Sequence, residues 1–245
     1  MGVYVYMNSG KTKGRLLMTI VSAENLKKYY GSEPNIAKAL DGVSLEIQSG
    51  EFVAIIGSSG SGKTTLLNMI GALDEPDSGT IFVDGKDLTK MSEDERTVFR
   101  RRKIGLVFQN YNLVPILSVY ENIVLPLEFD GQQPQEDWIM QLLDHLGIAE
   151  KAHQRPAALS GGQQQRVAIA RALSTHPSLI LADEPTGNLD SRTSREVVEL
   201  MVEAGKQYHQ TILFITHNER IAQMADRVLH IEDGRITNEK TNTAI

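Results

Sequence analysis

A glycine- and serine-rich segment that ends in lysine and threonine has the composition of a phosphate-binding loop. It follows the apolar run 51–56 and precedes a second apolar series at 66–70. Its residues are Gly57, Ser58, Ser59, Gly60, Ser61, Gly62, Lys63 and Thr64. Glycines let the backbone turn its N–H groups inward around a phosphate, and a following helix directs its positive dipole end at the same anion. This strand–loop–helix order is the context that a phosphate loop requires.

The last two residues of the loop supply different interactions. We expect the Lys63 ammonium to reach the β- and γ-phosphates of a nucleotide and the Thr64 hydroxyl to hold Mg²⁺. The next residue, Thr65, is included among the nucleotide-binding positions. The alternative is a flexible Gly/Ser loop without a ligand. A phosphate loop alone leaves kinases, GTPases and many ATPases open.

Two adjacent carboxylates follow another apolar run. Residues 179–182 predict a buried strand, and Asp183 and Glu184 stand at its end, before Pro185. Side chains alternate along a strand, so the two acids need not address the same ligand. Proline ends the strand ladder, and we expect it to hold Glu184 in an extended conformation. Near a phosphate loop such acids suit catalysis, and a solvated strand end is the alternative.

A third segment combines serine with paired glycines just before a helix predicted at about 163–173. Its residues are Leu159, Ser160, Gly161, Gly162, Gln163, Gln164, Gln165 and Arg166. Serine is a favourable N-cap, and glycines leave backbone N–H groups free for an anion. The segment therefore predicts a second phosphate-binding element, with a plain helix cap as the alternative.

At this segment the chain resembles the nucleotide-binding subunits of ATP-binding cassette (ABC) transporters, whose signature is Leu-Ser-Gly-Gly-Gln. The resemblance covers about Met18 to Gly234 and includes six motifs in the family's order. It implies an α/β fold, a P-loop NTPase core with an antiparallel β subdomain and an inserted α-helical signature subdomain. It also implies hydrolysis of ATP to ADP and phosphate, with Mg²⁺ as a cofactor.

The resemblance implies that the site is shared between two protomers. In the family, the signature covers the γ-phosphate of ATP held by the other protomer of a head-to-tail dimer, here through Ser160, Gly161, Gly162 and Gln163. The second protomer is a copy of this chain or a similar ATPase. Asp183 is implied to assist Mg²⁺, and Glu184 to act as the general base or to position the attacking water.

Three further motifs carry implied roles. Gln109 follows the run 104–108 and matches the glutamine that contacts Mg²⁺ or the attacking water. His217 follows the run 211–215 and matches the histidine that contacts the γ-phosphate and Glu184; alone, it would be assigned to a helix start. Asp190, in Asn188-Leu189-Asp190, matches the loop that crosses the dimer, and a polar turn is the alternative.

An aromatic side chain is expected to stack on the base of the nucleotide. Tyr30 sits where the family usually carries this aromatic residue, and Tyr29 beside it is the rival. A flat π-face accepts any purine, so stacking leaves GTP open as well as ATP.

Short apolar runs and helically spaced apolar residues supply the scaffold. Strands are predicted at 19–21, 43–47, 51–56, 80–83, 104–108, 179–182, 211–215 and 228–231, and helices around 138–146 and 197–204. Their alternation favours a parallel sheet, whereas the early strands before Gly57 are more typical of antiparallel pairing.

We expect a single domain over residues 18–245, with a mostly helical subdomain at about 109–165. Residues 1–17 are expected to be a disordered extension, and the polar tail from Thr237 to be disordered as well.

Composition narrows the partners. The 245 residues include 25 Lys+Arg and 31 Asp+Glu, a net charge of −6 that argues against nucleic-acid binding. The absence of cysteine excludes disulfides, thiolate zinc sites and cysteine nucleophiles. With no membrane-spanning run and no secretory signal, the chain is expected to be soluble. Transport then implies separate transmembrane permease subunits, with this chain cytoplasmic and peripheral on the inner face of the cell membrane.

Further segments suggest which transporter group this is. The run 99–113, with 121–123 and 184–190, resembles the group that serves lipoprotein release, macrolide and antimicrobial-peptide export and cell-division signalling. We expect export of, or resistance to, peptides or antibiotics, with lipoprotein release or cell-division signalling as the alternative. The basic cluster 100–103 predicts a solvated face, or else a contact with anionic headgroups. The apolar segment 113–120 lies where the family forms its groove for the permease, although most of it would belong to the subdomain's own core.

Other classes of protein fit less of the chain. A soluble ABC-type ATPase acting on DNA would need a long coiled coil between Gln109 and the signature, and only 110–158 lies there. Ribosome-associated members carry two ATPase domains, and this chain has one signature. A small-molecule kinase would not explain the signature, and a module without turnover would be expected to lack Glu184 or Lys63.

Overall fold

The structure, a computed structural model, describes residues 18–242. The expectation for residues 1–17 and the end of the polar tail, 243–245, lie outside the described residues. The strands are β1 (Thr19–Tyr30), β2 (Ala37–Gln48), β3 (Phe52–Ile56), β4 (Ser78–Val83), β5 (Lys86–Asp87), β6 (Ile104–Phe108), β7 (Leu179–Asp183), β8 (Thr211–Ile215), β9 (Arg227–Glu232) and β10 (Arg235–Thr241). Each predicted strand is present, and β1 and β2 extend well beyond the predicted runs.

The larger sheet is parallel along most of its width. Its strand order is β10-β9-β3-β8-β7-β6, and only β10 joins it antiparallel among the described strands. Every residue of β3 and β8 is buried, as expected for strands covered on both faces. Because parallel strands end at the same edge, the loops after β3, β6, β7 and β8 meet there.

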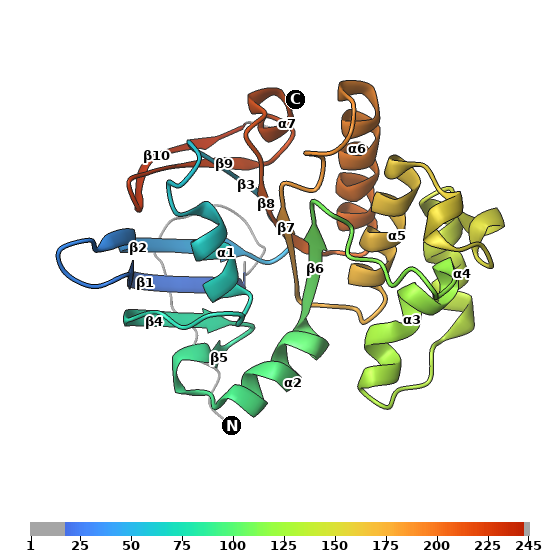
Figure 1. Cartoon of the computed structure of the whole chain (residues 1–245), viewed down its shortest axis with the longest axis horizontal. Helices are drawn as coiled ribbons and strands as arrows, with labels where there is room; N and C mark the ends of the chain where they lie inside the picture. Colours follow the sequence, from blue (N-terminus) through green and yellow to red (C-terminus); the bar gives the residue numbers. More distant parts are fainter. Residues whose placement is uncertain (1–17, 243–245) are drawn as a thin grey trace, which may run out of the picture.

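A smaller antiparallel sheet has the order β2-β1-β4-β5, as predicted for the chain before Gly57. Alternate residues of β1, such as Val21 and Ala23, are buried, so one face of this sheet is apolar. That face shares a buried cluster with α1 (Lys63–Ile70) and with Val53 and Ile55 of β3. Figure 1 shows the smaller sheet beside α1, away from α3, α4 and α5.

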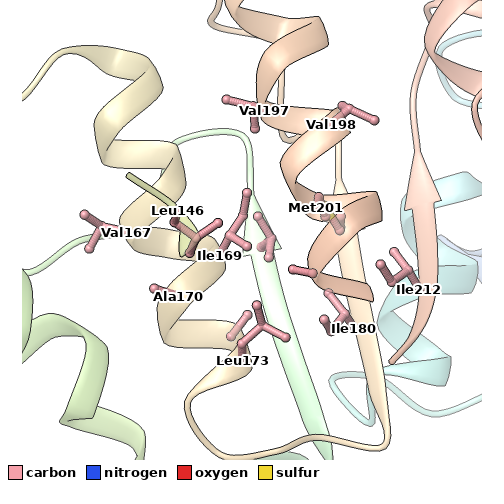
Figure 2. Packing of buried hydrophobic residues seen from close by; sticks show 14 of the residues in the cluster. Leu146, Val167, Ile169, Ala170, Leu173, Ile180, Val197, Val198, Met201 and Ile212 are labelled. Carbon is pink, nitrogen blue, oxygen red and sulfur yellow. The ribbon is translucent and has the colours of Figure 1, made fainter. Parts of the chain in front are cut away.

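Helices cover the other face of the larger sheet. They are α3 (Val119–Phe129), α4 (Glu136–His145), α5 (Gly161–Leu173) and α6 (Ser191–Gln207), and their apolar faces form one cluster with β3, β7 and β8. Figure 2 shows Ile169 and Leu173 of α5 facing the region of Met201 in α6 and Ile180 in β7. The remaining helices are α2 (Glu93–Lys103), α7 (Glu219–Ala222) and the 3-10 turns η1 (Leu88–Lys90), η2 (Ala149–Lys151) and η3 (Pro156–Ala158).

Side-chain caps fix where several helices begin. Ser92, Ser118 and Ser160 each accept a hydrogen bond from the backbone three residues ahead, in complete capping boxes that start α2, α3 and α5. The residues between β6 and α5 are therefore mostly helical, as predicted for 109–165, although α5 continues to Leu173 and packs on the larger sheet. That this region is a separate subdomain stays a prediction.

The polar tail was wrongly expected to be disordered from Thr237. Residues 235–241 form β10, which pairs with β9 in register from Arg235 opposite Glu232 to Thr241 opposite Arg227. The strand is almost entirely exposed, so its polarity reflects an edge position, and backbone hydrogen bonds to β9 hold it in place. Side-chain composition alone does not reveal such pairing.

The basic cluster at the end of α2 is engaged in internal contacts. Arg100 donates to the carbonyl of Ala72 at 2.6 Å, and Lys103 pairs with Asp84 at 2.9 Å. Arg101 and Arg102 both pair with Asp130, at 2.7 and 2.8 Å. The Asp130 side chain is only 3% exposed, so these pairs tie α2 to the loop after α3. These contacts tie the cluster to the rest of the chain, while the Arg102 and Lys103 side chains stay 54% and 46% exposed, so the cluster is also in part a solvated face.

The apolar segment 113–120 mainly serves the core, as the sequence suggested. Val119 is fully buried, and Leu113 and Tyr120 pack against the helical cluster. Pro115 and Ile116 are the exceptions, with Ile116 74% exposed. Among the described helices, none is both long enough and apolar enough to cross a bilayer.

Replacing Asp130 tests the tie between α2 and α3. Its hydrogen bond with Arg102 holds the pKa of Asp130 below its ordinary value. Such a carboxylate stabilises the fold above its unfolded pKa of about 3.9, and the stabilisation is lost as pH falls through the lower folded pKa. We expect Asp130→Asn to lower the melting midpoint at pH 7, by an amount that shrinks as the pH falls below about 4.

Thermal melts by circular dichroism across this pH range measure the effect. The control is Asp144→Asn, an exposed carboxylate of α4 for which the described structure shows no ion pair. A deficit for Asp130→Asn that stays constant with pH would contradict the ion-pair explanation.

Candidate active site

The predicted phosphate loop connects β3 to α1. The Lys63 side chain is 7% exposed, and its Nζ donates to the carbonyls of Gly57 at 3.0 Å and Ser58 at 2.7 Å. Gly62 has φ of 106°, and a Cβ atom there would collide with the carbonyl of Ala39. Only glycine meets both constraints, so this residue fixes how the loop enters α1. The loop therefore presents a buried cation and a helix N-terminus to the same place.

A polar pocket of about 390 Å³ lies at the carboxyl edge of the larger sheet. It draws side chains from the start of α1 and from the ends of β6 and β7, and its lining residues are Thr64, Phe108, Gln109, Asn110, Asn112, Asp183 and Glu184. Four residues predicted from three separate motifs thus come together, because β3, β7 and β6 belong to one parallel sheet and end at the same edge. The two pocket residues Thr64 and Asp183 are joined directly, with the Thr64 hydroxyl donating to Asp183 Oδ1 at 3.4 Å.

The donor set of this pocket suits a hard divalent cation. Burial raises the pKa of Asp183, and the neighbouring Glu184 carboxylate raises it further, while Thr64 and Lys63 act in the opposite direction. A bound cation would relieve this unfavourable negative charge. Within residues 18–242 no group of three or more His, Cys, Asp or Glu side chains could hold a metal alone. Thr64 and Asp183 would therefore hold Mg²⁺ together with oxygens of a phosphate.

Glu184 leaves β7 in a conformation that the sequence did not predict. Its φ is +45°, in the left-handed region, so the expectation that Pro185 would keep it extended was wrong. The Glu184 N–H donates to the carbonyl of Ile215 at 3.0 Å, which fixes the turn onto the end of β8. A non-glycine residue there costs about 1–3 kcal/mol, and such strain concentrates at functional sites.

The turn directs Glu184 towards His217. Glu184 Oε2 and His217 Nδ1 are hydrogen-bonded at 3.2 Å. Asp183 instead contacts Thr64, so the adjacent acids address different partners, a possibility that the sequence had left open. A carboxylate at a phosphate-binding pocket, oriented by a histidine, can accept a proton from water.

Gln109 is held by the loop that follows Glu184. Its Nε2 donates to Asn188 Oδ1 at 3.1 Å, and the Asn188 amide returns bonds to the carbonyl of Gln109 at 3.1 Å and to Asn110 Oδ1 at 2.9 Å. A Cβ atom on Gly187 would lie 2.6 Å from the Gln109 amide nitrogen, so only glycine allows this close approach. The two loops are thus interlocked beside the pocket.

Two predicted elements are not brought to the pocket by this chain alone. Ser160 and Gln163 form the capping box of α5, with Ser160 N–H to Gln163 Oε1 at 2.9 Å. Asp190 caps α6 by accepting from the N–H groups of Arg192 and Thr193. None of these residues, nor Gly161 or Gly162, lines the pocket. Ser160 and Asp190 are exposed, Gly161 and Gln163 are half-buried and Gly162 is buried, all of them at a helix start.

Tyr29 and Tyr30 are both anchored by carboxylates. The Tyr30 hydroxyl donates to Asp74 at 2.8 Å, and the ring, 44% exposed, has the Lys28 ammonium 5.4 Å from its centroid. The Tyr29 hydroxyl donates to Asp41 at 2.6 Å. Tyr30 presents the more exposed ring and therefore the better stacking surface.

Sequence reasoning missed some residues of the site. Phe108, Asn110 and Asn112 line the pocket, although none of the three was assigned a role in it, and Asn188, expected only as part of the loop that crosses the dimer, anchors Gln109. Adjacency to Gln109 was the available signal for the first three. The contact of Asn188, 79 residues from Gln109, has no local signal in the sequence.

The chain is similar in sequence to known proteins. The family model described as ABC transporter matches residues 40–187. The chain is 45% identical over 226 residues to the macrolide export ATP-binding/permease protein MacB of Syntrophobacter fumaroxidans, covering 91% of this chain and 32% of that relative. It therefore spans about a third of the length of that relative. The uncharacterized ABC transporter ATP-binding protein MJ0796 of Methanocaldococcus jannaschii is 42% identical, with 90% of this chain and 97% of that protein covered.

Solved structures agree with these matches. A dimeric structure of the ATP-binding cassette MJ0796, in a post-hydrolysis state bound to ADP and Pi, superposes with a TM-score of 0.82 at 40% identity. The superposition covers 92% of this chain and 100% of that chain.

Replacing the two tyrosines separately identifies the stacking residue. We expect Tyr30→Ala to raise the KM for ATP about tenfold, since base–aromatic stacking contributes about 1–3 kcal/mol. Tyr29→Ala should change the KM by less than about twofold, because its ring is less exposed. Steady-state ATPase assays on both purified variants, with melting curves to confirm folding, measure this. A larger effect for Tyr29→Ala would reassign the stacking surface to Tyr29.

Proposed function

Because the chain belongs to the ABC transporter family, we propose that it is the ATP-hydrolysing subunit that energises a transmembrane permease, in the export of peptides or antibiotics. The observation that carries the proposal is the pocket at the carboxyl edge of the sheet. There Thr64, Gln109, Asp183 and Glu184 converge, with His217 bonded to Glu184.

The pocket residues divide the work of phosphoryl transfer. Lys63 and the loop N–H groups stabilise the negative charge that develops on the transferred phosphoryl group. Glu184 positions a water molecule and accepts its proton, and His217 orients the carboxylate through the 3.2 Å contact. Thr64 and Asp183 hold Mg²⁺, which neutralises charge on the phosphate oxygens when bound. Gln109 lines the pocket, where its side chain would contact the cation or the attacking water.

The site is completed by a second protomer. Ser160, Gly161, Gly162 and Gln163 have helix-start N–H groups but lie outside the pocket of their own chain, and Asp190 is likewise outside it. A two-fold arrangement would place these groups over the partner's ATP. In such an interface, any contact that one protomer makes with its partner is matched by the same contact in the reverse direction. The dimeric MJ0796 cassette bound to ADP and Pi supports this arrangement. A copy of this chain is the partner we propose.

A groove beside the pocket is the proposed docking place of the permease. The groove, about 400 Å³, lies between α2, α3, β6 and α5, and three of its apolar lining residues are Leu125, Pro126 and Phe129. Phe129 is 69% exposed, unusual for so large an apolar side chain. The MacB relatives join ATP-binding and permease functions under one name, which supports a permease partner and a position on the inner face of the membrane.

We propose the exported substrate from the names of similar proteins in the family. The relative from S. fumaroxidans is named for macrolide export, which supports export of antibiotics or peptides. Lipoprotein release and cell-division signalling are the alternative roles of the same group. The identity of the permease would distinguish export from these two roles.

An ATP-trapped dimer tests the shared site. We expect Glu184→Gln to bind ATP but not hydrolyse it, and so to elute as a dimer with ATP and as a monomer without it. Light scattering coupled to size exclusion measures the mass. The control adds Lys63→Ala to the same variant, which removes the phosphate-binding ammonium and should abolish the ATP-dependent dimer. A Glu184→Gln protein that stays monomeric in saturating ATP would contradict the shared site.

The same variant captures the permease. We expect tagged Glu184→Gln with ATP, purified from membranes of its native host in mild detergent, to retain a membrane-spanning partner that mass spectrometry identifies. The nature of the partner's domains outside the membrane would separate export from lipoprotein release or signalling. A matched preparation with Phe129→Ser should lose the partner while keeping ATP binding. Recovery of soluble partners alone would overturn the transport role.

A further inference from the structure

The loop after β6 has an unfavourable backbone conformation. This loop, residues 109–112, is called here the Gln109 loop. Tyr111 and Asn112 have φ of 59° and 49°, so two consecutive residues other than glycine lie in the left-handed region. Consecutive residues in this region are disfavoured for L-amino acids, so contacts with the rest of the protein must hold the loop in place.

Arg171, near the end of α5, supplies those contacts. Its guanidinium donates to the carbonyl of Asn112 at 2.5 Å and to the carbonyl of Tyr111 at 2.7 Å. A planar guanidinium presents two N–H groups in a fixed fork that matches two successive carbonyls. A lysine ammonium lacks this fork, so the contact is specific to arginine.

The guanidinium has no counter-ion that would explain its position otherwise. Across residues 18–242 the structure shows no ion pair between Arg171 and a carboxylate, although most other arginines of the chain have one. The Arg171 side chain is partly buried, and this burial lowers the pKa of its guanidinium. A partly desolvated charge is costly unless its hydrogen bonds are strong, and both of those described go to the Gln109 loop.

The Gln109 loop separates the polar pocket from the docking groove. Phe108 and Asn112 line both cavities, while Gln109 lines only the pocket and Arg171 only the groove. Arg171 therefore touches, on the groove side, the backbone of the same short loop that carries Gln109 on the pocket side. A segment seated in the groove beside Phe129 would press on Arg171 and Asn112 together.

We propose that Arg171 is a positioning residue for ATP hydrolysis, which holds the Gln109 loop in its left-handed turn and so places Gln109 at the pocket. The inference rests on the proposed role of Gln109 in hydrolysis. The proposal adds a residue that does not contact the nucleotide. Arg171 lies 62 positions after Gln109 in the sequence, and it is bonded to the loop at Asn112, 59 positions before it.

A double-mutant cycle on the full chain tests the positioning role. The variants are R171K, Gln109→Ala and the two combined. The control is R195K, since Arg195 is an exposed arginine of α6 that pairs with Glu199 of its own helix at 2.8 Å, away from the Gln109 loop. We expect R171K to lower kcat about tenfold with an unchanged KM for ATP, because small misplacements of a positioned group cost this much or more. R195K should stay within about twofold of the parent protein.

Non-additivity is the decisive readout. If Arg171 acts through Gln109, the combined variant is no slower than Gln109→Ala, whereas general damage to the fold would multiply the two losses. A normal kcat for R171K, or multiplicative losses in the combined variant, would overturn the proposal. A normal kcat for Gln109→Ala would instead refute the proposed role of Gln109 in hydrolysis.

A spectroscopic measurement tests the clamp even if turnover is lost. The chain has no cysteine, so Asn110→Cys introduces a single attachment point for a nitroxide spin label on the exposed part of the Gln109 loop. We expect R171K to increase the mobility of this label in the electron paramagnetic resonance spectrum, with R195K leaving it unchanged. Equal spectra for the parent and R171K proteins would show that Arg171 does not hold the loop. Circular dichroism melts of each labelled protein establish that it is folded.

Discussion

Parallel pairing of β3, β8, β7 and β6 places the carboxyl ends of these strands side by side, and the pocket exists because of that alignment. Each strand ends in a polar residue or loop that could not be buried in the middle of the sheet. The phosphate loop follows β3, Gln109 follows β6, Asp183 and Glu184 end β7, and His217 follows β8. The apolar faces that hold these strands in register belong to two clusters on opposite sides of the sheet. Packing of the core therefore sets the geometry of the chemistry.

Electrostatic balance at this edge requires a ligand of mixed charge. Lys63 and the start of α1 favour an anion, whereas burial raises the pKa of Asp183, and a cation beside it would favour its charged form. A nucleoside triphosphate together with Mg²⁺ would supply both the anion and the cation. The left-handed conformation of Glu184 and its contact with His217 orient the carboxylate that we propose as the base.

The loops around the pocket are connected to surfaces that face outward. Asn188 binds Gln109 from one side, and Arg171 holds the next residues of the same loop from the other. The first contact leads towards Asp190 and the proposed dimer interface, and the second leads to the groove beside Phe129. One short loop is thus bonded both to the segment that precedes the interface and to the wall of the groove, which is the arrangement that coupling between sites requires.

Local patterns in the sequence determined the residues of the site and most of the elements that carry them. Lys63, Thr64, Asp183 and Glu184 could be assigned because a phosphate loop and a terminated strand depend on neighbouring residues alone. The family resemblance added Gln109 and His217, which spacing by itself did not identify. Only the tertiary structure showed the left-handed turn at Glu184, the strand at 235–241, and the contacts of Asn188 and Arg171 with the Gln109 loop. These features depend on hydrogen bonds between segments far apart in the chain or on backbone pairing at a sheet edge, and neither leaves a periodic pattern of side chains in the sequence.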